Sequence, residues 1–200
     1  MSIWRQMGAR TGGMLVRPGA TFRAAAADPA TFTLAYGAVL LAAPQLVLMV
    51  LGLFGRGFRG VGVDAILTSG LTGFAAGVAV LAGTALLVRW LARVLDGGAG
   101  LGGALTMVVH ATVPAWVLST IGNVVEPRQG LFGLIGIAWS IALLPVGAGA
   151  LLAVPPGKRG VFTFAAGAGM LLLWAAALLV VALVLANVLD REMAERVVRG

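Results

Sequence analysis

Residues 160–189 read GVFTFAAGAGMLLLWAAALLVVALVLANVL, a stretch of thirty residues without a charged side chain. A helix needs roughly 20 mainly apolar residues to cross about 30 Å of bilayer hydrocarbon. Four other stretches are also free of charge and exceed this length: residues 29–55, 65–88, 97–125 and 129–157. Helices of soluble proteins keep a polar face along their whole length. The charge pattern therefore predicts an all-α fold, a polytopic membrane bundle of five transmembrane helices.

The chain divides into three predicted parts. Residues 1–32 form a basic N-terminal segment, residues 33–189 the membrane domain, and residues 190–200 a short charged C-terminal tail. Because every connection is short, consecutive spans are expected to be antiparallel neighbours. The spans are expected at residues 33–54, 65–90, 101–125, 131–154 and 161–189.

Arginines recur through the N-terminal segment among apolar residues such as Trp4 and Phe22. This alternation is typical of an amphipathic helix that lies in the headgroup region of a membrane. Pro18 suits the first position of a short helix, and Asp28-Pro29 suits its end. A cleavable signal peptide would instead have one short basic region followed by an apolar core of about 7–15 residues. A disordered basic tail is the alternative.

The composition argues against an enzyme. Hydrophobic residues make up 60% and charged residues 10% of the chain, whereas soluble domains have about 45–50% and 25%. Five spans in 200 residues leave no room for a soluble catalytic domain. The chain has no cysteine and one histidine, and its acids lie near the span ends, which is too few ligands for a metal site. We therefore expect no catalytic residues and no cofactor.

The basic residues point to lipid as a partner. The net charge is +7, and most arginines flank the hydrophobic spans, where anionic lipid headgroups lie. We therefore expect contact with membrane lipids and not with nucleic acid. Arginine supplies 13 of the 14 basic residues, and together with the many Gly, Ala and Val residues this bias suggests a GC-rich bacterial genome. The expected location is a bacterial inner membrane. The candidate headgroup contacts are Arg17, Arg23, Arg89, Arg93, Lys158 and Arg159.

The same residues predict the orientation of the chain. Five spans place the two termini on opposite sides of the membrane. The side that holds the N-terminus carries eight basic residues, and the other side carries six. Because basic residues are enriched in cytoplasmic loops, the N-terminus is expected in the cytoplasm and the C-terminus in the periplasm.

Four motifs are spread over nearly the whole chain: Arg17-Pro18 with Phe22 before Asp28-Pro29, the turn Gly97-Gly98, the run from Val109 to Pro114, and the segment from Trp139 through Pro145 to Gly147 with the basic turn after it. In their order and spacing they resemble the Yip1 family of five-span membrane proteins. Two features depart from the family pattern. Val109 and His110 replace a glycine and a tyrosine, and the aspartate-leucine-tyrosine-glycine-proline signature of eukaryotic members is absent. The association of those members with Rab GTPases is therefore not carried over.

His110 is the one ionisable residue expected deep in a span. Such residues usually face a bundle interior or a wet cavity. Its function is either that of a proton relay or ligand contact, or that of a neutral imidazole bonded to a neighbouring span where the family has tyrosine. Pro114 in the same span, and Pro44 and Gln45 in the middle of the first, complete a candidate polar or kinked site.

Ser69, Gly73 and Gly77 repeat every four residues on one face of the second span. Small residues at this spacing let two helices approach closely. The face is expected to contact another span of the same bundle, and a homo-oligomer interface is the alternative.

These features together indicate a non-enzymatic scaffold, adaptor or membrane-organising protein. Its partners would be lipids and, in addition, other membrane proteins or a second copy. The alternative is a small transporter or channel for an unidentified solute, because broken helices are a feature of transporters. Discontinuity at Pro44 or Pro114 would favour this alternative.

Overall fold

The computed structural model describes residues 2–54, 62–98, 100–125 and 129–199 of the chain. The described residues form helices joined by turns, without a strand. Five helical segments are long and apolar enough to cross a membrane. The prediction of an all-α polytopic bundle with five spans is confirmed. Of the basic residues used to predict the orientation, Arg56, Arg59 and Arg128 lie outside the described residues.

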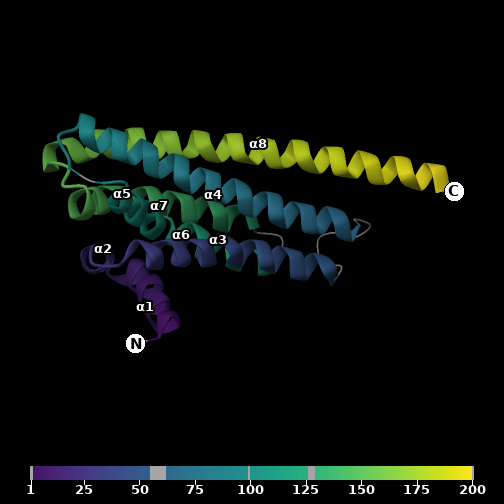
Figure 1. Cartoon of the computed structure of the whole chain (residues 1–200), viewed down its shortest axis with the longest axis horizontal. Helices are drawn as coiled ribbons and strands as arrows, with labels where there is room; N and C mark the ends of the chain where they lie inside the picture. The colour runs from purple at the N-terminus through teal and green to yellow at the C-terminus, as the bar shows by residue number, and fades with distance from the viewer. Residues whose placement is uncertain (1, 55–61, 99, 126–128, 200) are drawn as a thin grey trace.

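The spans run back and forth along one axis (Figure 1). The first two spans are α3 (Ala30–Leu53) and α4 (Val63–Val94). The third consists of two helices, α5 (Leu101–Ala111) and α6 (Val113–Val124). The last two are α7 (Gln129–Leu151) and α8 (Arg159–Arg199), with the short 3-10 helix η1 (Pro156–Lys158) between them.

Two of the spans are longer than the sequence predicted. Helix α4 has 32 residues, and α8 has 41 residues and continues without a break through the charged residues that follow Asp190. The predicted C-terminal tail is therefore the end of α8 and extends away from the rest of the bundle (Figure 1).

Two short helices, α1 (Ile3–Val16) and α2 (Pro18–Ala25), precede the first span. Pro18 occupies the first turn of α2, where its missing amide hydrogen leaves no helical bond unmade. Phe22 of α2 is fully buried. It lies against Gly147 of α7, where a Cβ atom would be 3.1 Å from the Phe22 ring and 2.8 Å from Met107. Helix α2 is thus fixed to one end of the bundle.

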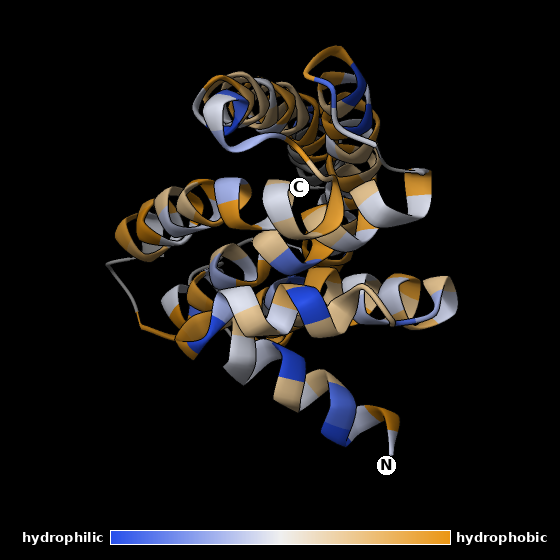
Figure 2. Ribbon diagram, turned by 90° about the vertical axis from the view of Figure 1, so that its left-hand side faces the viewer, coloured by the Kyte–Doolittle hydropathy of each residue, from blue (hydrophilic) through white to orange (hydrophobic). Residues whose placement is uncertain are grey.

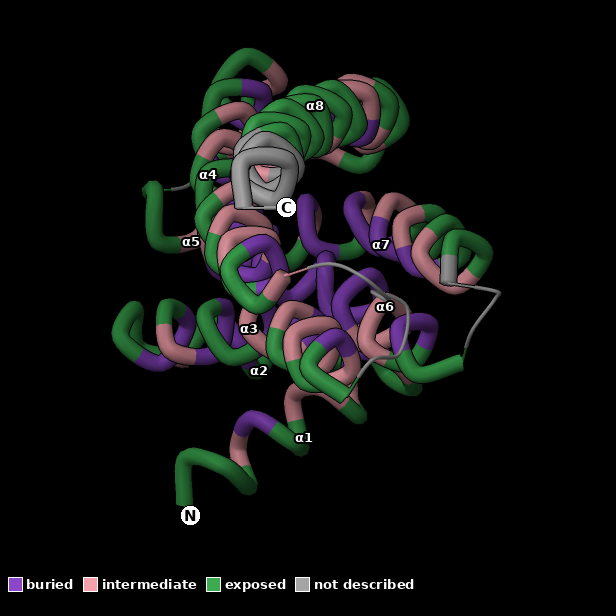
Figure 3. The backbone as a smooth tube through the Cα atoms, turned by 90° about the vertical axis from the view of Figure 1, so that its right-hand side faces the viewer, coloured by how far each residue is buried: buried purple, intermediate pink, exposed green. Residues whose placement is uncertain are grey.

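The third span forms the core of the bundle. In an apolar stretch of 18 residues within the third span 67% of the residues are buried, whereas in such a stretch of the last span 6% are buried. Figure 3 shows the same contrast between α5 and α6 inside the bundle and α8 at its edge. Many large apolar residues on the outside of the spans are exposed. Along the ribbon the spans are mostly hydrophobic, and hydrophilic residues gather on α1 and in the turns (Figure 2). Such a surface suits a hydrocarbon environment.

Candidate functional site

The third span is broken near its middle. Helix α5 ends at Ala111, and α6 begins at Val113 with Pro114 in its first turn. Proline has no amide hydrogen, and its ring clashes with the carbonyl four residues earlier, so a proline inside a helix kinks or breaks it. The hydroxyl of Thr112, at the break, donates to the Val108 carbonyl at 2.9 Å.

The break brings α6 close to α7. At Gly136 of α7 a Cβ atom would lie 2.7 Å from Ala115 Cα and 3.0 Å from the Pro114 carbonyl oxygen. Any side chain other than hydrogen would therefore push the two backbones apart. Helix α7 therefore packs directly against the backbone where the third span is interrupted.

His110 lies two residues before Thr112, where the span is broken, and is completely buried. Its Nδ1 is 2.8 Å from the Thr106 carbonyl oxygen, and its ring centroid is 5.3 Å from that of Tyr36 on α3. Because a carbonyl oxygen only accepts, Nδ1 carries the hydrogen. In neutral His110, Nε2 is then a lone-pair acceptor, and it has no hydrogen-bond partner among the described residues. An unpaired buried acceptor costs less than an unpaired charge.

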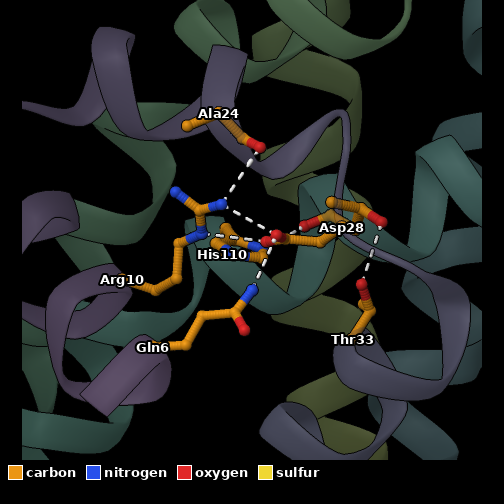
Figure 4. A network of polar contacts seen from close by, with 7 residues as sticks. Gln6, Arg10, Ala24, Asp28, Thr33 and His110 are labelled. Atoms are coloured by element: carbon orange, nitrogen blue, oxygen red, sulfur yellow. Dashed lines mark hydrogen bonds and ion pairs between the residues drawn. The ribbon is translucent and has the colours of Figure 1, made fainter. Parts of the chain in front are cut away.

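An ion pair lies beside His110 and joins α1 to the turn before α3 (Figure 4). Arg10 donates from Nε to Asp28 Oδ2 at 2.8 Å and from Nη2 to Asp28 Oδ1 at 2.7 Å. Gln6 donates to the same Oδ1 at 3.0 Å, and Arg10 Nη2 also donates to the Ala24 carbonyl at 3.0 Å. The Arg10 and Asp28 side chains are 18% and 5% exposed. The carboxylate is thus held by two side chains of α1.

Two hydroxyl contacts join α1 to the first span and the first span to the third. Thr11 of α1 donates to the Met7 carbonyl at 3.0 Å and lies 2.9 Å from the Tyr36 hydroxyl. Since the Thr11 hydrogen is used by Met7, Tyr36 is the donor in the second contact. Thr33 of α3 and Thr106 of α5 are 3.3 Å apart. We call Gln6, Arg10, Thr11, Asp28, Tyr36, Thr106 and His110 the polar cluster.

Of the polar cluster, the sequence pattern predicts only His110 as a site residue. A signal for Asp28 is nevertheless present in the sequence. Asp28 is the one acidic residue before Asp64, and it follows four arginines. An isolated acid among arginines at the start of a membrane span indicates a specific ion pair.

The other residues of the predicted kinked site lie elsewhere. Helix α3 continues through Pro44, whose carbonyl accepts a hydrogen bond from Asn123 of α6 at 3.0 Å. Gln45 is half-buried and faces Gly73 of α4, where a Cβ atom would lie 2.6 Å from the Gln45 Oε1 atom. Pro44 lies eight residues, or about 12 Å of helix, beyond Tyr36. The structure therefore does not bring Pro44 and Gln45 together with His110.

The small-residue face of α4 is occupied by α3. At Gly77 a Cβ atom would lie 2.6 Å from the Leu41 side chain and 3.7 Å from Trp116. Gly73 faces Gln45, and Ser69 on the same face is half-buried. This face contacts spans of the same chain.

The six candidate headgroup residues belong to α2 and its N-cap, the last turns of α4, η1 and the first residue of α8, and these segments lie at one end of the bundle (Figure 1). Arg17, Arg23 and Arg93 are exposed, and Arg89 is half-buried. Lys158 forms an ion pair with Asp96, and Arg159 donates from Nε to the Val154 carbonyl at 3.0 Å. The end is therefore strongly basic.

The geometry can be compared with known proteins. A family model described as the Yip1 domain matches residues 12–179, which include four spans and most of the fifth. No curated protein and no solved structure matched the chain. The matched region covers more than half of the chain and contains all of the motifs that resembled the family. The chain belongs to the Yip1 family of integral membrane proteins.

Proposed function

We propose that this Yip1-family chain is a non-enzymatic scaffold or membrane-organising subunit. The observation that carries the proposal is the polar cluster, in which Arg10 binds Asp28, Thr11 contacts Tyr36, and the His110 ring packs against Tyr36, so that α1, α3 and α5 are joined. Asp28 binds Arg10 and Gln6, and His110 binds a helix carbonyl. The contacts of Asp28 fix α1 to the turn before α3, and the His110 bond lies within α5 itself. A general acid or base would instead have to reach a substrate.

The alternative of a small transporter or channel draws on the break at Thr112. In transporters of known fold, half-helix ends point at the substrate or the coupling ion. Here the Thr112 amide bonds to the Val108 carbonyl at 3.0 Å, and the Trp116 amide bonds to the Thr112 carbonyl at 3.2 Å. The start of α6 lies against Gly136. Backbone groups satisfied in this way favour a packing role for the break.

The proposed location is a bacterial inner membrane with the N-terminus in the cytoplasm and the C-terminus in the periplasm. The basic end of the bundle, with Arg17, Arg23 and Arg93 exposed, supports this orientation. The far end of α8 would then lie on the periplasmic side.

Purification from native membranes tests the scaffold role. A tagged chain would be cross-linked in intact cells, extracted in mild detergent and compared with an unrelated five-span protein carrying the same tag. A scaffold should recover a defined set of membrane proteins in near-stoichiometric amounts, as measured by mass spectrometry. Recovery of the chain without such proteins, together with solute flux in vesicles that contain the purified chain alone, would favour the transporter.

A further inference from the structure

Two arginines from distant parts of the chain line one cavity. Arg23 comes from α2, and Arg159 begins α8. Together with Gly19, Gly149 and other residues of α7 they surround a space of about 500 Å³ at the basic end of the bundle. Ligand sites typically have volumes of about 300–1,000 Å³.

Both guanidinium groups are placed over glycines. Arg159 is oriented by the hydrogen bond from its Nε to the Val154 carbonyl, and its guanidinium lies where a Cβ atom of Gly149 would be. The Nη1 atom of Arg23 is 3.9 Å from the Cβ position of Gly19. Gly149 therefore leaves the space that the Arg159 guanidinium occupies, and Gly19 lies in ordinary contact range of Arg23.

Neither arginine is neutralised by a carboxylate in the part of the chain that the structure describes. The ion pairs found there are Arg10 with Asp28 and Lys158 with Asp96. Two guanidinium groups that share one cavity repel each other unless an anion binds between them. Guanidinium groups bind phosphate oxygens with pairs of parallel hydrogen bonds.

An apolar groove continues from this cavity along the membrane-facing surface. A second space of about 540 Å³ lies between α7 and α8 and shares Pro145 with the first. It is lined by Ile141, Phe164, Ala168, Leu171 and their neighbours, and Phe164 is 80% exposed. The Thr163 hydroxyl donates to the Arg159 carbonyl at 2.7 Å, so its hydrogen is used within the helix. The groove thus suits a hydrocarbon chain.

We propose that the cavity and the groove together bind one anionic glycerophospholipid. Its phosphate lies between Arg23 and Arg159, and one acyl chain lies along the groove between α7 and α8. The charge at the mouth, the apolar groove below it and its position at a span end match this occupant. Basic pockets between membrane helices bind anionic headgroups in this way. The site goes beyond the scaffold role and does not depend on it.

Native mass spectrometry of the full chain tests the headgroup half of the site. The chain would be mixed with phosphatidylglycerol or phosphatidylcholine in detergent, and retained lipid would be counted. We expect phosphatidylglycerol to be retained preferentially and Arg23→Gln or Arg159→Gln to weaken its binding on the order of tenfold. Arg93→Gln removes an exposed arginine elsewhere on the same end and should change binding less than twofold. An equal loss for Arg93→Gln would mean unspecific charge attraction and would overturn the proposal.

Two further variants separate the lipid from a soluble anion. Gly149→Ala should displace the Arg159 guanidinium and weaken lipid binding, whereas at Gly157 a Cβ atom would meet nothing within 4 Å, so Gly157→Ala should not. Ala168→Phe fills the groove and should weaken phosphatidylglycerol while leaving the cavity intact. Unfolding temperature and gel filtration would verify that each variant is folded. The lipid site is refuted if Ala168→Phe binds lipid normally, if glycerophosphate without acyl chains competes as well as the lipid, or if a second copy of the chain excludes lipid from the groove.

Discussion

Arg10 of α1 binds both carboxylate oxygens of Asp28, 18 residues further along the chain, at 2.8 Å and 2.7 Å. This bidentate pair fastens α1 to the turn before α3. Helix α1 also contacts α5 and α6, so the pair holds α1 against the third span. Charge-assisted pairs with this geometry are among the strongest hydrogen bonds in proteins. The Asp28 side chain is 5% exposed, so the carboxylate depends on its partners on α1.

Breaking this pair should destabilise the protein strongly. Arg10→Gln leaves a buried carboxylate without its cation, and removing one partner of a buried pair costs about 3–5 kcal/mol. We expect a clear fall in the unfolding temperature in detergent. Asp96→Asn is the matched control, because the Lys158–Asp96 pair is 43% and 72% exposed and exposed pairs contribute about 0–1 kcal/mol. Similar unfolding temperatures for the two variants would contradict a fastening role for Arg10.

Gly136→Ala should destabilise the contact between α6 and α7. Its Cβ atom would lie 2.7 Å from Ala115 Cα and 3.0 Å from the Pro114 carbonyl, and backbone atoms cannot rotate away. Overpacking of this kind costs about 1–3 kcal/mol. Gly133→Ala, on the same helix, meets nothing within 4 Å and should be neutral. Thermal unfolding of the purified variants measures the difference, and equal stability would mean that α6 and α7 are further apart.

Gly77→Leu should lower the unfolding temperature of the chain itself and should not convert an oligomer into a stable monomer. The larger side chain would collide with Leu41 of α3 and approach Trp116. At Gly102 a Cβ atom meets nothing within 4 Å, so Gly102→Leu should leave stability nearly unchanged. Gel filtration combined with thermal unfolding checks this prediction. A stable Gly77→Leu monomer derived from an oligomeric parent would support the homo-oligomer alternative.

The orientation can be tested with single cysteines, since the natural chain has none. Gly8→Cys and Gly157→Cys lie at the basic end, and Phe54→Cys replaces an 82% exposed side chain at the end of α3. In cells permeabilised only at the outer membrane, an impermeant thiol reagent should label Phe54→Cys and leave the other two unlabelled. Labelling at Gly8 and Gly157 with none at Phe54 would reverse the topology.

The five spans followed from the sequence because hydrocarbon tolerates few charges, and the charges therefore mark the span ends. The break in the third span was harder to predict. Pro44 and Pro145 lie inside continuous helices, whereas Pro114 begins a new one. The same residue type gives different results because neighbouring groups decide how a freed backbone is satisfied. Asn123 of α6 also donates to the Pro44 carbonyl, a contact between residues 79 positions apart that no local pattern predicts.

The polar cluster could not be assembled from sequence for a related reason. His110 was noticed because an ionisable residue inside a span is rare. Its neighbours Arg10 and Asp28 belong to other elements, and their approach depends on how α1 turns back at Val16 and Pro18. No spacing rule within a single helix predicts that contact.

We propose that His110 is a packing residue of a scaffold and does not relay protons. Wild-type chain and His110→Phe would be reconstituted in vesicles containing a pH-sensitive dye, and proton flux would be measured under an imposed gradient. Phenylalanine keeps a planar ring but cannot titrate. We predict that neither protein carries flux above that of protein-free vesicles and that both remain folded. Flux through the wild-type chain that a folded His110→Phe variant lacks would contradict the scaffold and establish a proton pathway through His110.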